Sequence, residues 1–232
     1  MRSKQKDINV KMRAILIDWL ISVHVKFALI PRTLFLAISI LDRYLERVPI
    51  ARQKLQLVGI CCLLMASKIE EVYYPQVQDF AEISDNSITK KEIIEMEGCI
   101  VSRLGFEFSE ACTLDFFEYF SGKLAFNEKM KEFGMYILEL CLVEYETLNY
   151  KSSLLSGSTI YLALKVFSRK IDADWENFIM MKCGFSMEEV RECVKQLWFM
   201  GKNQEKSRLN SVAKKHMDLL KEFTQKLNDV AL

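Results

Sequence analysis

The chain of 232 residues contains few residues that interrupt helices, with eight glycines and three prolines. Nearly every segment places its apolar residues with the 3.6-residue period of an α-helix, so the sequence excludes a strand-rich fold and predicts an all-α protein. Helices are expected near residues 11–28, 32–46, 53–68, 76–83 and 88–103, and then near 112–122, 127–147, 152–168, 174–182 and 187–200. A polar amphipathic helix is expected near 207–227.

Long apolar runs are also absent. A membrane-spanning helix needs about 18 or more consecutive apolar residues, whereas Asp18 and Lys26 interrupt the first apolar segment and Lys68 ends the richest one. The N-terminal sequence MRSKQKDINVK is polar and lacks the apolar region of a signal peptide. We therefore expect a soluble, intracellular protein without a membrane partner.

Neither sign of charge dominates the sequence. The net charge is +1, from 32 lysines and arginines against 31 aspartates and glutamates. Proteins that bind nucleic acid through its phosphates usually carry a marked positive excess. No nucleic-acid partner is therefore expected.

Patterns for metal binding and disulfides are missing as well. The seven cysteines are odd in number and contain no Cys-x-x-Cys pair: Cys61, Cys62, Cys99, Cys112, Cys141, Cys183 and Cys193. Most of them lie in apolar helical pattern and are expected to be small core residues in a reducing compartment. The histidines, His24 and His216, have no metal-ligand spacing, so no metal and no other cofactor is expected.

Motifs of catalysis are not found either. There is no phosphate-binding glycine loop, no G-x-S-x-G turn and no H-E-x-x-H pair. Two pairs of adjacent carboxylates, Glu70-Glu71 and Glu188-Glu189, point to different sides of a helix and are expected to be solvated. The sequence therefore predicts no catalytic residue.

The segment MRAILIDWL (residues 12–20) is apolar on two opposite sides. Because successive residues of a helix are about 100° apart, one side carries Met12, Ile15, Leu16 and Trp19, and the other carries Ala14, Ile17, Ile21 and Val25. Such a helix is either enclosed by neighbours or keeps one apolar side for a partner. Arg13 lies outside the polar stripe and requires a carboxylate, because an unpaired buried cation is costly.

The two halves of the chain resemble each other. Residues 57–68 (LVGICCLLMASK) align without gaps with residues 154–165 (LLSGSTIYLALK), although chance similarity between apolar helices is an alternative. Both segments are apolar nearly all round and contain small residues, so each is expected to be the central helix of a bundle. The predicted organisation is two tandem five-helix domains, residues 1–108 and 109–206, and a C-terminal helical segment, residues 207–232.

Five blocks in the first half resemble the first box of a cyclin, most closely of an A- or B-type mitotic cyclin. In chain order they are MRAILIDWL (12–20), ILDRYL (40–45), KLQLVGICCLLMASKIEE (54–71), TKKEIIEME (89–97) and LGFEF (104–108). The second half is similar to a second cyclin box through YLALK (161–165), Trp175 and GFSMEEV (184–190). The resemblance covers roughly residues 10–200 and implies that both predicted domains are cyclin boxes.

This resemblance implies a regulatory subunit without catalysis of its own, which binds and activates a cyclin-dependent protein kinase and so controls progression through G2 and mitosis. A cyclin pushes the αC helix of the kinase inward, which completes a Lys–Glu ion pair needed for phosphoryl transfer. By position, the implied kinase-binding residues are Lys68, Ile69, Glu97, Val101, Phe106 and Phe108. The implied location is the nucleus and the cytoplasm.

The first block also resembles the patch with which cyclins dock Arg-x-Leu motifs of substrate or inhibitor proteins. The matching positions are Met12, Ile15, Leu16, Trp19, Arg52 and Gln56. Several cyclins have a glutamate where this chain has Ser22, and that glutamate meets the arginine of the peptide. Its loss is expected to weaken or broaden recognition. For Arg13, the resemblance suggests Asp42 as the partner in a structural ion pair.

Two other functions stay open at this point. A cyclin-fold transcription factor would carry basic surfaces and usually a zinc ribbon, which the charge balance and the cysteine spacing disfavour. An adaptor would dock peptides without activating a kinase. Taken without the resemblance, Lys68 is a cation that complements a helix C-terminus, and Phe106 and Phe108 are inter-domain core.

Overall fold

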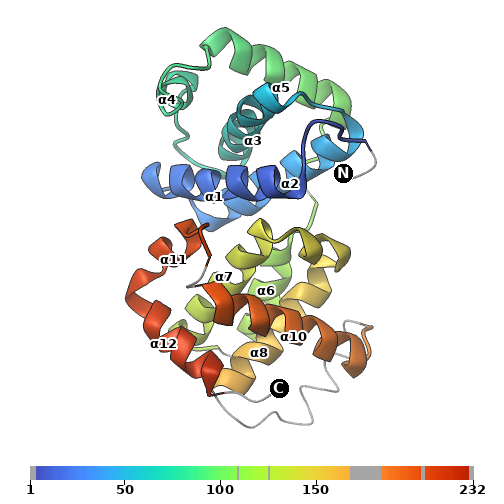
Figure 1. Cartoon of the computed structure of the whole chain (residues 1–232), viewed down its shortest axis with the longest axis vertical. Coiled ribbons are helices and arrows are strands. Elements are labelled where there is room, and N and C mark those ends of the chain that lie inside the picture. The colour runs from blue at the N-terminus through green and yellow to red at the C-terminus, as the bar shows by residue number, and fades with distance from the viewer. Residues whose placement is uncertain (1–3, 109, 125, 168–183, 205–206, 230–232) are drawn as a thin grey trace. The chain divides into compact units, whose positions relative to one another are not determined.

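The computed structural model of the chain describes residues 4–108, 110–124, 126–167, 184–204 and 207–229. Their regular structure is helical throughout, and these residues include no strand. The chain divides into two compact units, Met1–Glu110 and Ala111–Leu232 (Figure 1). The prediction of an all-α protein is confirmed.

The first unit is a bundle built around helix α3. It consists of α1 (Val10–Lys26), α2 (Pro31–Arg47), the short 3₁₀ helix η1 (Arg52–Lys54), α3 (Leu55–Glu70), α4 (Val77–Glu82) and α5 (Lys90–Leu104). Helix α3 contacts the four other α-helices of the unit, and every residue from Leu57 to Ser67 is buried. The expected central position of this segment is confirmed.

The side chains of the N-cap residues stabilise the first turns of helices α1 and α5. Asn9 Oδ1 accepts a hydrogen bond from Met12 N at 2.9 Å. Thr89 and Glu92 form a reciprocal capping box, in which each side chain accepts from the main-chain nitrogen of the other. Such caps satisfy amide groups that a helix leaves unpaired at its first turn.

Glu70 and Glu71 at the end of α3 form hydrogen bonds with residues at the start of α2. Glu71 Oε1 accepts hydrogen bonds from Ile30 N at 2.9 Å and from Thr33 Oγ1 at 2.5 Å, and Glu70 Oε1 accepts from Arg32 Nε at 3.1 Å. The prediction that this pair is solvated is wrong, because a helix N-terminus with unpaired amides attracts carboxylates. Helix α2 lacks a side-chain cap from its own preceding residue, and Glu71 supplies one from a distant part of the sequence.

A buried glutamine ahead of α1 holds the turn that follows α2. Gln5 is 7% exposed. Its Nε2 donates to Leu45 O and to Val48 O, both at 2.6 Å, and its Oε1 accepts from Ile50 N at 3.0 Å. One side chain therefore satisfies three main-chain groups at the exit of the helix, a role that no sequence pattern indicated.

We expect Gln5→Ala to lower the free energy of unfolding of the first unit by about 1–3 kcal/mol, because main-chain groups at a buried position lose their partner. Urea denaturation provides the measurement. The matched control is Gln53→Ala, an exposed position of η1, which should shift the unfolding free energy by at most about 0.5 kcal/mol. Equal effects of the two substitutions would contradict the anchoring role.

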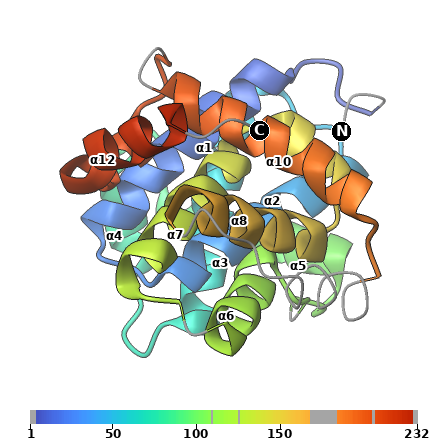
Figure 2. The same ribbon diagram turned by 90° about the horizontal axis from the view of Figure 1, so that it is seen from below.

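The second unit is built around helix α8. Its elements include α6 (Thr113–Lys123), α7 (Glu128–Val143), the 3₁₀ helix η2 (Tyr145–Asn149), α8 (Ser152–Phe167) and α10 (Met187–Asn203). Helix α8 contacts α6, α7 and α10 (Figure 2), and every residue from Leu154 to Ala163 is buried. The predicted helix near 174–182, with Trp175, lies outside the described residues.

Two segments of the second unit differ from the sequence-based expectation. The helix expected over 127–147 ends at Val143, and η2 follows it; Thr147 Oγ1 donates to Cys141 O and to Glu144 O, both at 2.7 Å. The C-terminal helix expected over 207–227 is divided into α11 (Ser211–Lys215) and α12 (Met217–Asn228). His216 separates them, with φ −106° and ψ 24°.

Four described cysteines are buried, as expected: Cys61, Cys62, Cys141 and Cys193. Burial raises the pKa of the Cys193 thiol to about 11, so this thiol stays protonated at neutral pH. The expectation is wrong at Cys99, which is exposed on α5, and Cys112 is intermediate. Cys183 lies outside the described residues.

The described residues include neither a metal-binding cluster nor a membrane-spanning helix. No group of three or more histidines, cysteines, aspartates and glutamates there could hold a metal ion. None of the helices in this part of the chain combines the length and the apolar character needed to cross a membrane.

Candidate functional site

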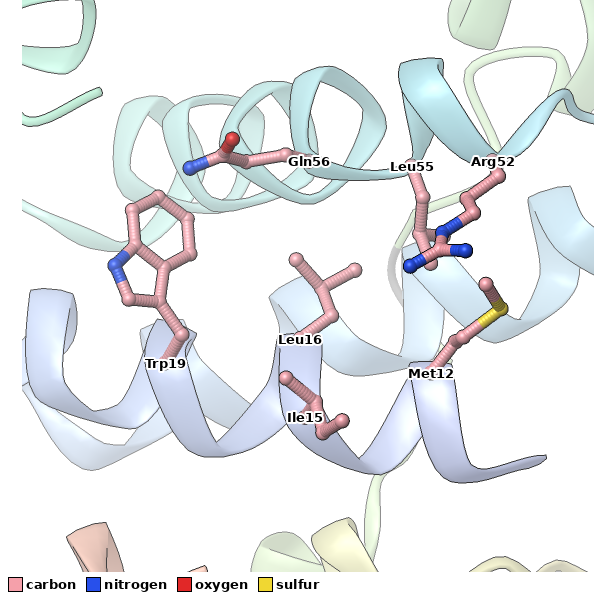
Figure 3. A pocket seen from close by; sticks show the side chains of 7 residues that line it. All are labelled: Met12, Ile15, Leu16, Trp19, Arg52, Leu55 and Gln56. Atoms are coloured by element: carbon pink, nitrogen blue, oxygen red, sulfur yellow. The ribbon is translucent and has the colours of Figure 1, made fainter. Parts of the chain in front are cut away.

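An apolar groove lies on the first unit between α1 and the start of α3. It holds about 290 Å³ and is lined by Met12, Ile15, Leu16, Trp19, Arg52, Leu55 and Gln56 (Figure 3). Six of these are the residues that the sequence analysis assigned to a docking patch. Leu55 was not assigned, although it follows Arg52 by three residues and so belongs to the same helical face.

The floor of the groove depends on a close approach of α1 and α3. A Cβ atom on Gly59 of α3 would lie 2.9 Å from Leu16 Cδ1, so a larger residue at position 59 would force the Leu16 side chain to shift. Leu16 is 6% exposed, whereas Ile15 is 50% exposed. Both residues lie on the same apolar side of α1, but the missing Cβ of Gly59 allows Leu16 to pack inward.

Polar groups occupy the two ends of the groove. Figure 3 shows Gln56 of α3 across from Trp19 at one end and Arg52 across from Met12 at the other. Arg52 and Gln56 are both exposed, so the Gln56 amide and the Arg52 guanidinium are accessible to a ligand. An apolar floor with hydrogen-bonding groups at its ends suits part of an extended peptide.

A second candidate surface contains the ion pair between Lys68 and Glu97. These residues lie at the end of α3 and in the middle of α5, and Lys68 Nζ donates to Glu97 Oε1 at 2.7 Å and to Oε2 at 2.8 Å. Their side chains are 32% and 24% exposed. Because an ammonium group has three donors and a carboxylate about four acceptor sites, both groups can bind a partner while they remain paired.

The other assigned positions in this part of the chain are apolar. Ile69 is 47% exposed and Phe106 is 87% exposed, while Val101 is half-buried. We refer to Lys68, Ile69, Glu97, Val101 and Phe106 as the α3–α5 surface. Exposed apolar side chains and a partly exposed ion pair are the kinds of groups found at protein interfaces.

Phe108 does not belong to this surface, since it is only 8% exposed. The chain turns between the two phenylalanines, where Phe108 N donates to Phe106 O at 3.1 Å. Of the six residues assigned to kinase contacts, Phe108 is thus the one that the structure buries.

The backbone is fixed on both sides of Phe106. Gly105 ends α5 with φ 69°, a left-handed conformation that favours glycine. Beyond it, Arg43 Nη1 of α2 donates to Glu107 O at 2.7 Å. The exposed Phe106 therefore lies between two fixed points of the backbone.

Further exposed apolar residues lie close in sequence to residues of the α3–α5 surface, and the sequence analysis did not assign them. Val72 and Tyr73, in the link after α3, are 86% and 92% exposed, and Ile94 is 56% exposed one helical turn before Glu97. The available signal was the run EEVYYP, in which apolar residues lie between the end of a helix and a proline.

The structure pairs Arg13 of α1 with Asp42 of α2. Arg13 Nε donates to Asp42 Oδ1 and Nη2 donates to Oδ2, both at 2.6 Å, which is a two-pronged contact. The Arg13 side chain is 1% exposed and that of Asp42 is 18% exposed. This pair joins the helix that carries the groove to its neighbour.

Comparisons with known proteins agree with the fold. Residues 1–109 match the family model "Cyclin, N-terminal domain", and residues 112–231 match "Cyclin, C-terminal domain". Among solved structures, a viral cyclin from herpesvirus saimiri aligns with a TM-score of 0.72 and 23% sequence identity, over 84% of this chain and 88% of the viral chain.

Curated relatives are similar over most of this chain. The G2/mitotic-specific cyclin-B of Dictyostelium discoideum is 37% identical over 213 residues, which are 92% of this chain and 49% of the relative. Cyclin-B2-1 of Oryza sativa subsp. japonica is 42% identical over 195 residues, 84% of this chain and 46% of that protein. The chain thus spans about half the length of the curated relatives it matches. Because its two halves match the two cyclin domains in order, the chain belongs to the cyclin family.

Proposed function

We propose that this chain is a regulatory subunit that binds and activates a cyclin-dependent protein kinase and thereby controls passage through G2 into mitosis. The α3–α5 surface carries the proposal, because it combines a partly exposed ion pair with exposed Ile69 and Phe106. Its residues also match the positions that the family resemblance assigns to kinase contacts. The B-type names of the curated relatives agree with a role in mitosis.

The proposed mechanism is a shift in the conformational equilibrium of the kinase. The cyclin contributes no catalytic residue; it binds the conformer in which the αC helix is turned inward and the Lys–Glu pair is formed. A ligand that prefers one conformer by about 10⁴-fold moves a kinase from mostly inactive to mostly active. The catalytic machinery belongs to the kinase.

The direct test adds the purified chain to an inactive cyclin-dependent kinase and measures phosphorylation of a histone-type substrate together with co-elution. We expect co-elution and a large gain in activity. If the chain neither co-elutes with the kinase nor stimulates it, kinase binding is contradicted. The chain would then be a cyclin-fold protein outside kinase control. Binding of Arg-x-Leu peptides without stimulation would instead identify a docking adaptor.

We further propose that the groove between α1 and α3 docks Arg-x-Leu motifs of substrate or inhibitor proteins. The apolar floor and Trp19 suit the leucine of the motif, and the exposed Gln56 amide suits the peptide backbone. No carboxylate is among the seven residues that line the groove, and Ser22 lies exposed on α1 one helical turn after Trp19. The arginine of the motif therefore lacks the glutamate that several cyclins place at this position.

Ser22→Glu is expected to tighten binding of an Arg-x-Leu peptide about tenfold, because it adds one charge-assisted hydrogen bond. Fluorescence anisotropy with a labelled peptide measures the Kd. Ser22→Gln, which has the same shape without the charge, and an Ala-x-Leu peptide are the controls, and both should show little gain. Equal tightening toward both peptides would contradict an arginine contact at residue 22.

A further inference from the structure

Helix α7 carries a carboxylate that is completely buried. Glu139 is 0% exposed. Its Oε1 accepts a hydrogen bond from Lys215 Nζ at 2.5 Å, and its Oε2 lies 3.0 Å from His216 Nε2. Burial tends to raise the pKa of Glu139, but the hydrogen bond with His216 and the charge of Lys215 outweigh it and hold this pKa below its ordinary value. The buried group is therefore charged at neutral pH.

Both partners of Glu139 are consecutive residues at the break between α11 and α12. Lys215 ends α11, and His216 has non-helical φ and ψ angles. On an unbroken helix, neighbouring residues point about 100° apart. The break allows both side chains to reach the same carboxylate, which accounts for the division of the helix that the sequence predicted as continuous.

Helix α12 is held by two buried apolar residues, Phe223 and Leu227, both 0% exposed. The Phe223 ring contacts Phe133 and Tyr136 of α7, with centroids 5.3 and 5.7 Å apart. Trp198 Nε1 of α10 donates to Leu227 O at 2.7 Å. These anchors lie on α7 and α10.

Few residues of this segment are buried. In α11 and α12 together, the buried residues are Ser211, Val212, Phe223 and Leu227. Segments with few buried apolar contacts open at lower free energy than the core of their domain. Glu139 opposes gradual opening, because removing its partners leaves a charge buried without compensation, which is strongly unfavourable.

We propose that residues 211–228 form a strap that detaches from the second unit as one piece, and that Glu139 is the latch that keeps it docked. While Lys215 and His216 pair with the carboxylate, the strap covers the faces of α7 and α10 that carry Tyr136 and Trp198. Its release uncovers this apolar surface, and the rest of the second unit stays folded. The strap is thus a conformational device distinct from the surfaces assigned to the kinase and to peptides.

Hydrogen exchange on the full chain, followed by mass spectrometry, tests the proposal. In Glu139→Gln, amides of residues 211–228 should exchange about tenfold faster, while those of α8 keep their rates, because the opening is local. The matched control is Glu132→Gln, an exposed position of the same helix, which should leave both segments unchanged. Equal acceleration in α8 and in the strap, or no acceleration, would overturn the proposal.

A second variant separates a latch from an ordinary contact. The double substitution Lys215→Gln with His216→Gln leaves the Glu139 carboxyl buried without its cationic partner, so the strap should exchange about 100-fold faster, beyond the effect of Glu139→Gln. If both variants accelerate exchange equally, the charge of Glu139 does not act as a latch. The double substitution lies near the surface and remains informative if Glu139→Gln fails to fold.

Discussion

Arg13→Ala is expected to lower the free energy of unfolding of the first unit by about 3–5 kcal/mol, the cost of breaking a buried ion pair from one side. The Arg13 side chain is 1% exposed and holds Asp42 through two hydrogen bonds of 2.6 Å. Without it, Asp42 stays mostly buried and loses its cation. Since a domain is typically stable by only 5–15 kcal/mol, much of the stability of this unit depends on one side chain.

Amide exchange in α2 and α3, measured across a urea series, reports on the first unit alone. Arg13→Lys is the graded variant, because it keeps the charge and loses the planar two-pronged geometry; it should fall between wild type and Arg13→Ala. The control is Lys91→Ala, whose exposed pair with Glu95 spans 3.8 Å and contributes at most about 0.5 kcal/mol. An Arg13→Ala effect as small as this control would show that water replaces the guanidinium.

The helical architecture could be predicted from the sequence because it depends on local patterns. The all-round apolar segments 57–67 and 154–163 became the buried centres of α3 and α8, and the capping box that starts α5 joins Thr89 to Glu92, only three residues away. These features need only neighbouring residues.

The errors arise where distant residues meet. The amphipathic pattern of 207–227 continues through His216, and the break there depends on Glu139, 77 residues earlier. Glu71 caps α2 from a position 41 residues beyond Ile30. Periodicity carries no information about such contacts.

The candidate sites show the same difference between features that follow from local patterns and features that depend on distant contacts. Position within helices, combined with the family resemblance, brings six groove residues together, but the burial of Leu16 depends on Gly59 of another helix. The exposure of Val72 and Tyr73 was not predicted because they lie in a link between helices, where the 3.6-residue period does not apply. Lys68 and Glu97 were both assigned to kinase contacts, whereas their direct pairing across 29 residues appears only in the structure.

Exchanging the charges of Lys68 and Glu97 is expected to separate the proposed kinase contact from the stability of the fold. The double variant Lys68→Glu, Glu97→Lys keeps an oppositely charged pair at the same place, so its Tm should stay within about 2 °C of wild type. A kinase that binds the two groups at their present positions then meets the wrong charge at both. Its affinity should fall about 100-fold or more, as expected when charged contacts at an interface become repulsive.

Calorimetric titration with the kinase measures this affinity, and a thermal melt of the same sample measures the stability. The matched control exchanges Lys91 and Glu95, an exposed i,i+4 pair on α5, and should alter neither quantity. Lys68→Ala with Glu97→Ala should also lose kinase affinity at an unchanged Tm, because the partly exposed pair contributes little to folding. Kinase binding that survives both the exchange and the alanine variant would remove these two residues from the interface, whereas a large drop in Tm would make them part of the fold instead.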